Sequence, residues 1–140
     1  MSLVRAIGRR LVLAVLLVFA LSLSVRSDEL GEFHAAVEQA AAAHRAAMET
    51  LETSGQQETA AAVQRLRQVW QDINVRFVKY PPGPFANDEK FRTMFMLVDT
   101  QLVGVLLVID MGNRDAARNG LAPVGPTLAQ LVARSAPTEP

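Results

Sequence analysis

The 140-residue chain contains no cysteine, only two histidines and few aromatic residues, which make up 6% of it. The absence of cysteine excludes a disulfide framework, a thiolate metal site, a cysteine nucleophile and covalently attached c-type haem. Fourteen basic residues balance fourteen acidic ones. Proteins that bind nucleic acid need a surplus of positive charge to neutralise phosphates, so this balance argues against that class.

Several patterns that would indicate catalysis are also missing. The chain has no glycine-rich phosphate loop, no Gly-x-Ser-x-Gly sequence and no Glu-x-x-His pair of the kind that di-iron bundles use. We therefore do not expect an enzyme. Half of the residues are apolar, which is too many for a disordered chain, and the length suits one domain.

The charge balance hides an asymmetry at the N-terminus. Residues 1–27 contain four arginines and no acidic residue, and an apolar run extends from Leu11 to Val25. A basic segment followed by such a run is typical of a signal peptide, and the run is shorter than the roughly 20 apolar residues that span a bilayer. We expect residues 1–27 to be a signal peptide or an N-terminal membrane anchor. The remainder would be periplasmic or secreted, tethered to the inner membrane if the segment is uncut.

Apolar residues recur at spacings of three and four along the rest of the chain, and no segment alternates with period two. Helices are expected over residues 28–54, 57–79 and 87–111, with a fourth from 114 to 134 that bends near residue 120 because two prolines lie inside its pattern. Asp28 is the expected N-cap of the first helix and Gly55 its C′ residue. The sequence thus predicts an all-α, antiparallel up-down-up-down four-helix bundle over residues 28–134, followed by a disordered tail at 135–140. The predicted core positions of the four helices are Leu30, Phe33, Val37, Ala40, His44, Ala47 and Leu51; Val63, Leu66, Trp70, Ile73, Phe77 and Tyr80; Phe91, Met94, Val98, Leu102, Val105 and Ile109; and Ala117, Leu121, Val124, Leu128 and Leu131.

The third helix is more apolar than a two-faced helix requires. The stretch from Leu102 to Ile109 is apolar on every side except at Gly104, which favours a contact with a protein partner or a second copy through the extra face. A membrane span is the less favoured interpretation, because Asp99 and its polar neighbours interrupt the run. Asp99 itself either pairs with Arg65 or Arg67 or flanks the apolar stripe in water, and the second interpretation is preferred.

The two histidines cannot bind one ion together. On a helix, His34 and His44 point roughly 80° apart and lie about 15 Å apart along the axis. His44 falls on the apolar stripe, where a hydrogen-bonded core residue is the better interpretation. His34, in the first turns, is the one candidate ligand for a metal or haem. The methionines are at core-compatible spacings and form no copper-type cluster with a histidine.

Three local sequences resemble the soluble b-type cytochrome called cytochrome b-562 and its relative cytochrome c prime. Residues 29–34 (Glu-Leu-Gly-Glu-Phe-His) are similar to the acidic opening of the first helix, where the b-type family has an axial methionine at the position of His34. Residues 80–82 and 87–91 are similar to its second loop, and residues 112–117 to the turn before its fourth helix. The resemblance implies a four-helix bundle with a haem pocket, lined here by Leu30, Phe33 and Val37.

The chain departs from both families at the ligands. The b-type family takes its second haem ligand from a histidine near the end of the fourth helix, and no histidine follows His44. The c-prime family uses Cys-x-x-Cys-His, which is absent here. The leading hypothesis is therefore a cofactor-free, non-enzymatic binding or accessory module of cytochrome-like fold. The alternatives are a b-type haem protein for electron transfer that uses His34 as its axial ligand, and a membrane-anchored subunit of a larger complex held through residues 11–25.

Overall fold

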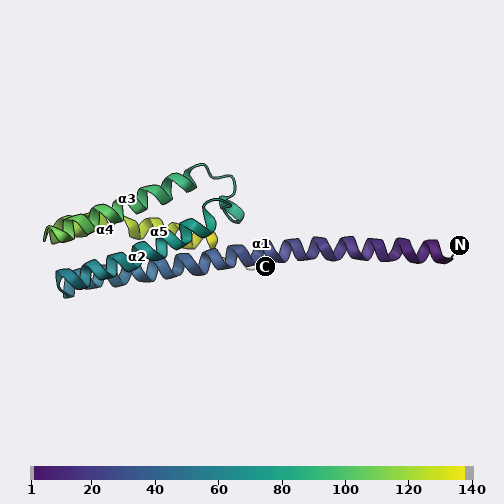
Figure 1. The fold of residues 1–140 in the computed structure, drawn as a ribbon, viewed down its shortest axis with the longest axis horizontal. Helices are drawn as coiled ribbons and strands as arrows, with labels where there is room; N and C mark the ends of the chain where they lie inside the picture. The colour runs from purple at the N-terminus through teal and green to yellow at the C-terminus, as the bar shows by residue number, and fades with distance from the viewer. Residues whose placement is uncertain (1, 138–140) are drawn as a thin grey trace.

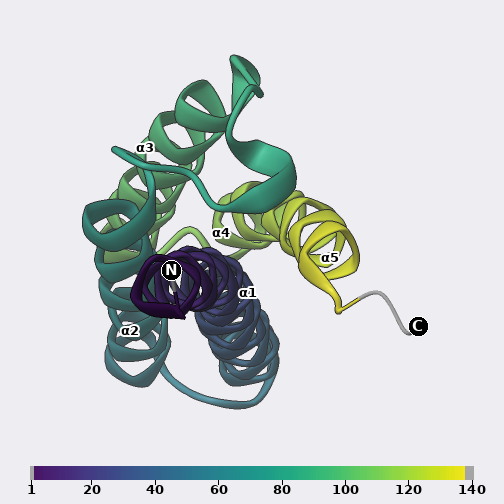
Figure 2. The same ribbon diagram turned by 90° about the vertical axis from the view of Figure 1, so that its right-hand side faces the viewer.

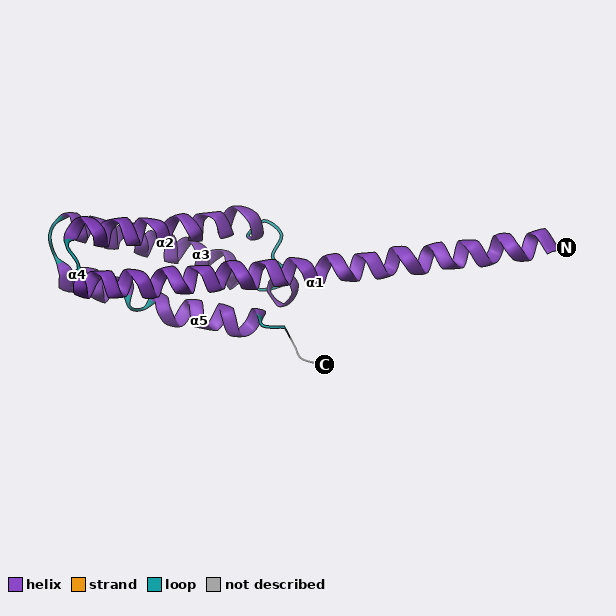
Figure 3. Ribbon diagram, turned by 90° about the horizontal axis from the view of Figure 1, so that it is seen from below, coloured by secondary structure: helices purple, strands orange, loops and turns teal. Residues whose placement is uncertain are grey.

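The computed structural model describes the backbone of residues 2–137 and the side chains of residues 28–137. Within this part the chain is helical apart from its turns and loops, and it contains no strand (Figure 3). The all-α prediction is confirmed. The elements are α1 (Ser2–Thr53), α2 (Gln56–Phe77), a short 3-10 helix η1 (Gly83–Phe85), α3 (Lys90–Asp110), α4 (Arg114–Leu121) and α5 (Val124–Ser135).

Helix α1 does not begin at Asp28, as the sequence analysis expected, but runs without a break from Ser2 to Thr53. The stretch contains no proline, and nothing else in it forces the backbone out of helical geometry, so a capping residue at Asp28 starts no new helix. The N-terminal half of α1 projects from the bundle along its long axis (Figure 1). The boundary expected between residues 27 and 28 therefore lies inside one continuous helix.

Helix α2 packs along the second half of α1 after a connection of two residues. Gly55 lies in this connection in an extended conformation (φ −79°, ψ 179°), as the N-cap of α2, so the left-handed C′ role expected for it is wrong. The predicted stripe from Val63 to Phe77 is buried. Tyr80 was wrongly included, because α2 ends at Phe77 and the Tyr80 side chain beyond it is 76% exposed.

Helix α3 begins at Lys90, three residues later than expected, where the Asp88 carboxylate accepts a hydrogen bond from the Lys90 backbone N–H at 3.0 Å. Its core stripe includes Phe95, which the sequence analysis missed. The Phe95 ring stacks on Trp70 of α2 with ring centroids 4.2 Å apart. The backbone carbonyl of Phe95 also accepts a hydrogen bond from the Trp70 indole N–H at 3.1 Å. The helix ends before Gly112, whose φ of +74° suits a residue without a Cβ.

The fourth helical segment is divided into α4 and α5, as the prolines predict. Asn113 caps α4 by accepting a hydrogen bond from the Ala116 N–H at 3.0 Å. At the break, the Gly125 N–H bonds to the Ala122 carbonyl. The Leu121 carbonyl instead accepts a hydrogen bond from His44 Nε2 of α1 at 2.8 Å.

His44 is thus a buried, hydrogen-bonded core residue, as expected, and its ring packs closely against Gly125. A Cβ at Gly125 would lie 3.0 Å from the His44 ring. The end of α5 was placed one residue too early, since Ser135 belongs to the helix and is buried. The expected disordered tail otherwise falls on residues 136–140, of which 138–140 lie outside the described part.

Viewed along the long axis, α1, α2, α3 and the α4–α5 segment surround a common core (Figure 2). Helix α1 contacts α2, α4 and α5, while α3 contacts α2 and α4. The remaining predicted core positions are buried, except Leu30 and Met94, which are half-buried at the edge. This arrangement leaves one face of α3 outside the core.

Replacing His44 by leucine tests the role of this imidazole in holding α4 and α5. His44→Leu leaves the buried Leu121 carbonyl without its donor, which costs about 1–3 kcal/mol of folding free energy. Chemical denaturation followed by circular dichroism measures this change. The matched control is Arg45→Leu at the adjacent exposed position, where a change within about 0.5 kcal/mol is expected. Equal stability of His44→Leu and the control would contradict the assignment.

Candidate binding face

The candidate ligand His34 lies on α1 with both ring nitrogens in contact with protein groups. Its Nδ1 is 2.9 Å from the Ser135 hydroxyl oxygen on α5, and its Nε2 is 3.4 Å from a Glu38 carboxylate oxygen one turn further along α1. The Ser135 hydroxyl donates to the Leu131 carbonyl at 2.6 Å, so His34 is the donor in the contact with Ser135. The side chain is 19% exposed. His34 thus links α1 to α5.

The three residues expected to line a haem pocket lie on the same helix face as His34, and the space beside them is filled. Phe33 and Val37 are fully buried, and Leu30 packs against Gly83 of η1. The ring centroid of Phe33 lies within 6 Å of those of Phe77, Phe85 and Phe91, at 5.2, 5.1 and 5.9 Å. A haem macrocycle placed here would have to displace several of these rings as well as the Ser135 contact. The residues present therefore do not fit haem in this arrangement.

The described side chains form no cluster of possible metal ligands. No three histidine, cysteine or carboxylate groups come together among residues 28–137 in a way that would hold an ion. The single carboxylate near His34 is Glu38, and the His44 ring is committed to the Leu121 carbonyl. His34 as a metal ligand thus remains a prediction that rests on the sequence alone.

Sequence reasoning missed two aromatic residues that shape this end of the bundle. Phe95 is four residues after Phe91, a spacing that places both on one helix face. This spacing could have predicted Phe95 as a core residue. Phe85 carried no periodic signal, because it lies in the 3-10 helix of a proline-rich loop. Its ring centroid is 5.0 Å from that of Phe91, and the Arg134 guanidinium lies 4.5 Å above it. The loop thus closes the end of the core.

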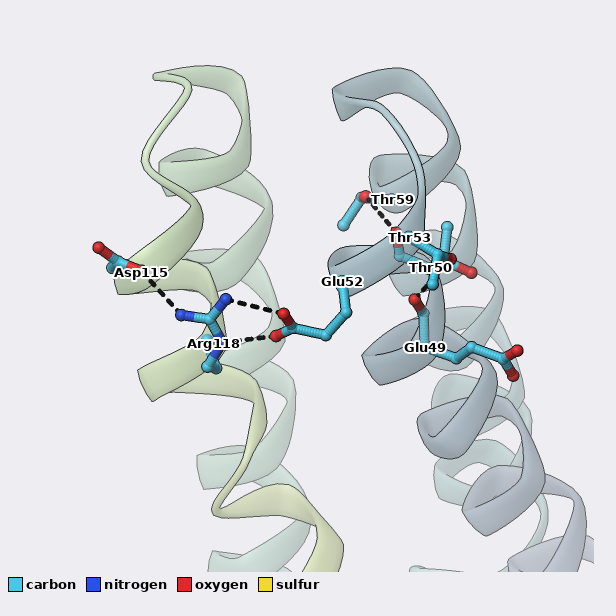
Figure 4. A network of polar contacts seen from close by, with 7 residues as sticks. All are labelled: Glu49, Thr50, Glu52, Thr53, Thr59, Asp115 and Arg118. Atoms are coloured by element: carbon cyan, nitrogen blue, oxygen red, sulfur yellow. Dashed lines mark hydrogen bonds and ion pairs between the residues drawn. The ribbon is translucent and has the colours of Figure 1, made fainter.

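A charged network joins α1 to α4 at the opposite end. Figure 4 shows Glu52 extending from α1 toward Arg118, with Asp115 on the other side of the guanidinium. The two Glu52 oxygens accept hydrogen bonds from Arg118 at 2.5 and 3.0 Å, and Asp115 accepts a third at 2.7 Å. The hydrogen bond from Arg118 lowers the pKa of the Glu52 carboxyl below its ordinary value, and the same bond raises the pKa of Arg118. The two carboxylates and the guanidinium bond to one another and connect α1 to α4.

A cleft of about 200 Å³ lies where the α1–α2 and α3–α4 turns meet. The Gln56 amide donates to the carbonyls of Ile109 and Asp110 at 2.6 and 3.0 Å, and Arg114 donates to the Ser54 carbonyl at 3.0 Å. The polar groups of the cleft therefore connect the α1–α2 turn to the α3–α4 turn. The cleft is lined by Leu51, Gln56, Thr59, Ile109, Gly112, Arg114 and Ala117.

The outer face of α3 carries most of the exposed large apolar side chains of the described residues. Its exposed residues are Met96 (64%), Leu97 (60%), Val103 (45%), Leu107 (61%) and Met111 (72%), with Thr100 and Gly104 between them. Isolated apolar residues are ordinary on protein surfaces, but contiguous patches mark interaction sites. This face is the candidate binding surface, and we call it the α3 face.

No charge interrupts the α3 face. Between Thr93 and Ile109 the only charged residue is Asp99, on the flank of the helix. Its carboxylate pairs with Arg67 of α2 at 3.0 Å and is about one-third exposed. Asp99 thus flanks the stripe and is partly exposed, as preferred, but it is also paired, because the two helices approach closely enough for Arg67 to reach it.

Among the residues whose side chains are described, α3 is the one helix long and apolar enough to cross a membrane, judged by length and composition. Only 28% of its most apolar window is buried in the bundle. A helix at the centre of a core would hide most of that surface. The α3 face is therefore a candidate contact surface.

Comparisons with known proteins leave the family open. No family model matches the chain, and no curated protein or solved structure matches it. The likeness to the b-type cytochromes thus rests on the three local sequences and on the helical layout.

A haem titration tests the fit at His34. Because the His34 nitrogens and the adjacent aromatic rings are occupied by protein contacts, we expect no saturable Soret band when the full-length protein is titrated with haemin in detergent. His34→Ala is the matched control, and its spectrum should equal that of the wild type. A stoichiometric Soret band that disappears in His34→Ala would contradict this expectation.

Proposed function

We propose that this protein is an exported, non-enzymatic helical-bundle module that works by binding another protein through the α3 face. The observation that carries the proposal is the uncharged run of exposed apolar side chains on α3. Exposed apolar patches beyond a few hundred Å² are rare on monomeric soluble proteins and mark interaction sites. A protein contact removes this surface from water without requiring a catalytic group.

The proposed bundle has the up-down-up-down topology, with α4 and α5 together forming its fourth helix. The short connections after α1 and α3 and the loop around η1 support it, because brief links favour antiparallel neighbours. In this proposal the protein has a cytochrome-like fold but has lost the usual haem ligands. The b-type family takes its second ligand from near the end of the fourth helix, and in that region this chain has Ser135 in contact with His34.

Export rests on residues 1–27, with their arginines and the apolar run from Leu11 to Val25. The unbroken α1 supports the tethered form, because an anchor and a bundle that share one helix need no linker. In that form the protein is a membrane-anchored accessory subunit. The b-type haem alternative would require His34 to release both Ser135 and Glu38.

Protease accessibility tests the export. In cells whose outer membrane has been opened, we expect added protease to digest the bundle while a cytoplasmic marker survives. The N-terminal arginines remain on the cytoplasmic side by the positive-inside rule. Retention in the membrane after alkaline washing indicates the uncut anchor, whereas a soluble chain beginning near residue 28 indicates cleavage. Protection of the entire chain would contradict export.

Photo-crosslinking in cells tests the α3 face. A photoreactive amino acid at Leu107 should give a covalent protein adduct, because a contacting partner lies within a few ångströms of an interface side chain. The control is the same substitution at Val75 of α2, which is 81% exposed but lies outside the α3 face, and no adduct is expected there. Equal labelling at the two positions, or none at Leu107, would contradict the proposed role of the face.

A further inference from the structure

We propose that the partner of the α3 face is a second copy of this chain, with the two α3 helices parallel and in register. This inference rests on the proposed function and names the partner at the same surface. Three features of the molecule support it: the absence of charge on the face, the spacing of its residues, and the direction in which α1 leaves the bundle.

A symmetric dimer brings each residue near the axis close to its own copy. Any charged residue at the centre of such an interface would face a like charge. Between Thr93 and Ile109 the α3 face has none. Asp99 on its flank bonds to Arg67 of its own chain, and Arg92 and Asp110 lie at its two ends. The face is therefore compatible with itself over most of its length.

The spacing of the exposed residues is that of a helix-pairing seam. Met96, Thr100, Val103 and Leu107 follow one another at intervals of four, three and four, which is the pattern by which two helices pack side by side. Gly104 lies beside this seam, and a Cβ placed there would meet nothing within 4 Å. A second helix can approach closely at this point.

The direction of α1 determines the relative orientation of two copies. The N-terminal half of α1 projects along the long axis of the bundle, and α3 lies along the same axis (Figure 1). If residues 11–25 of both copies lie in one membrane, the two bundles point the same way. Their α3 helices are then parallel to each other and to the membrane normal.

An antiparallel pair would place Arg92 of one copy near Asp110 of the other. Ion pairs between exposed side chains contribute little to stability, so this attraction does not outweigh the shared orientation of two anchored chains. The interface is also small. Helix α3 is 21 residues long, about 30 Å, and stable dimers bury about 800 Å² per partner, which one helix face does not reach. Anchoring in the same membrane supplies the missing affinity by raising the effective concentration of the copies.

Single-cysteine crosslinking tests both the partner and the orientation, because the chain has no cysteine of its own. Met96→Cys, Val103→Cys and Leu107→Cys are introduced separately into the full-length chain and oxidised in native membranes. A parallel, in-register pair gives disulfide-linked dimers at all three positions. Val75→Cys on α2 is the matched exposed control and should give none.

The same series separates the orientations. In an antiparallel pair that places Arg92 near Asp110, the centre is residue 101. The copies of residues 96 and 107 then lie roughly 15–18 Å apart along the axis, too far for a disulfide, whereas those of residue 103 lie roughly 6 Å apart. Dimers from Val103→Cys alone would therefore overturn the parallel register. In the parallel dimer, adding Leu107→Glu to Val103→Cys should lower the dimer yield by about tenfold, because like charges then face each other across the axis.

The failure of this inference is distinguishable from the failure of the proposed function. Absence of dimers at all three positions, with each cysteine reactive toward a soluble maleimide, overturns the second copy. A heterologous photo-adduct at Leu107 would then leave the proposed function intact, and its absence would remove both. If the cysteines form no dimers and react with maleimide only after the membrane is dissolved, α3 lies against lipid. That outcome also overturns the dimer.

Discussion

The bundle depends on the burial of the apolar stripe along residues 33–51 of α1. Helices α2, α4 and α5 all contact this half of the molecule's longest helix, and α3 joins the assembly through α2 and α4. Several stripe positions are alanines, including Ala36, Ala40 and Ala47, which bury little area themselves but let neighbouring helices approach closely. The bulk of the core is therefore supplied from elsewhere, chiefly by Trp70 and the phenylalanines of α2, η1 and α3.

Both histidines hold the C-terminal helices against this stripe. His44 supplies a donor to the Leu121 carbonyl where the helix breaks, and His34 donates to Ser135 at the end of α5. Arg118 adds a charged link from α4 to Glu52. Among the described residues, every buried side-chain nitrogen or oxygen has a hydrogen-bond partner. The two histidines and Arg118 thus join α1 to the C-terminal helices.

The position of the α3 face follows from how α3 is packed. Its inner face, with Phe91, Phe95 and Leu102, completes the core, while Arg67 neutralises the charge of Asp99 on one flank. A helix with one inner face needs only that face to be apolar. The outer apolar residues add nothing to the described bundle, and they are explained if a further surface covers them. The membrane anchor proposed for residues 11–25 would restrict which surfaces can do so.

The sequence by itself determined the helical elements and most of the core. The spacing of Val63, Leu66 and Trp70, the break between Leu121 and Val124, and the cap at Asn113 depend on local periodicity and backbone chemistry, which act over a few residues. The tertiary structure decided the contacts between residues far apart in sequence. No local pattern indicates that His34 meets Ser135, that Asp99 meets Arg67 or that Phe85 of a loop enters the core, because these contacts depend on which helices become neighbours and on how closely they approach.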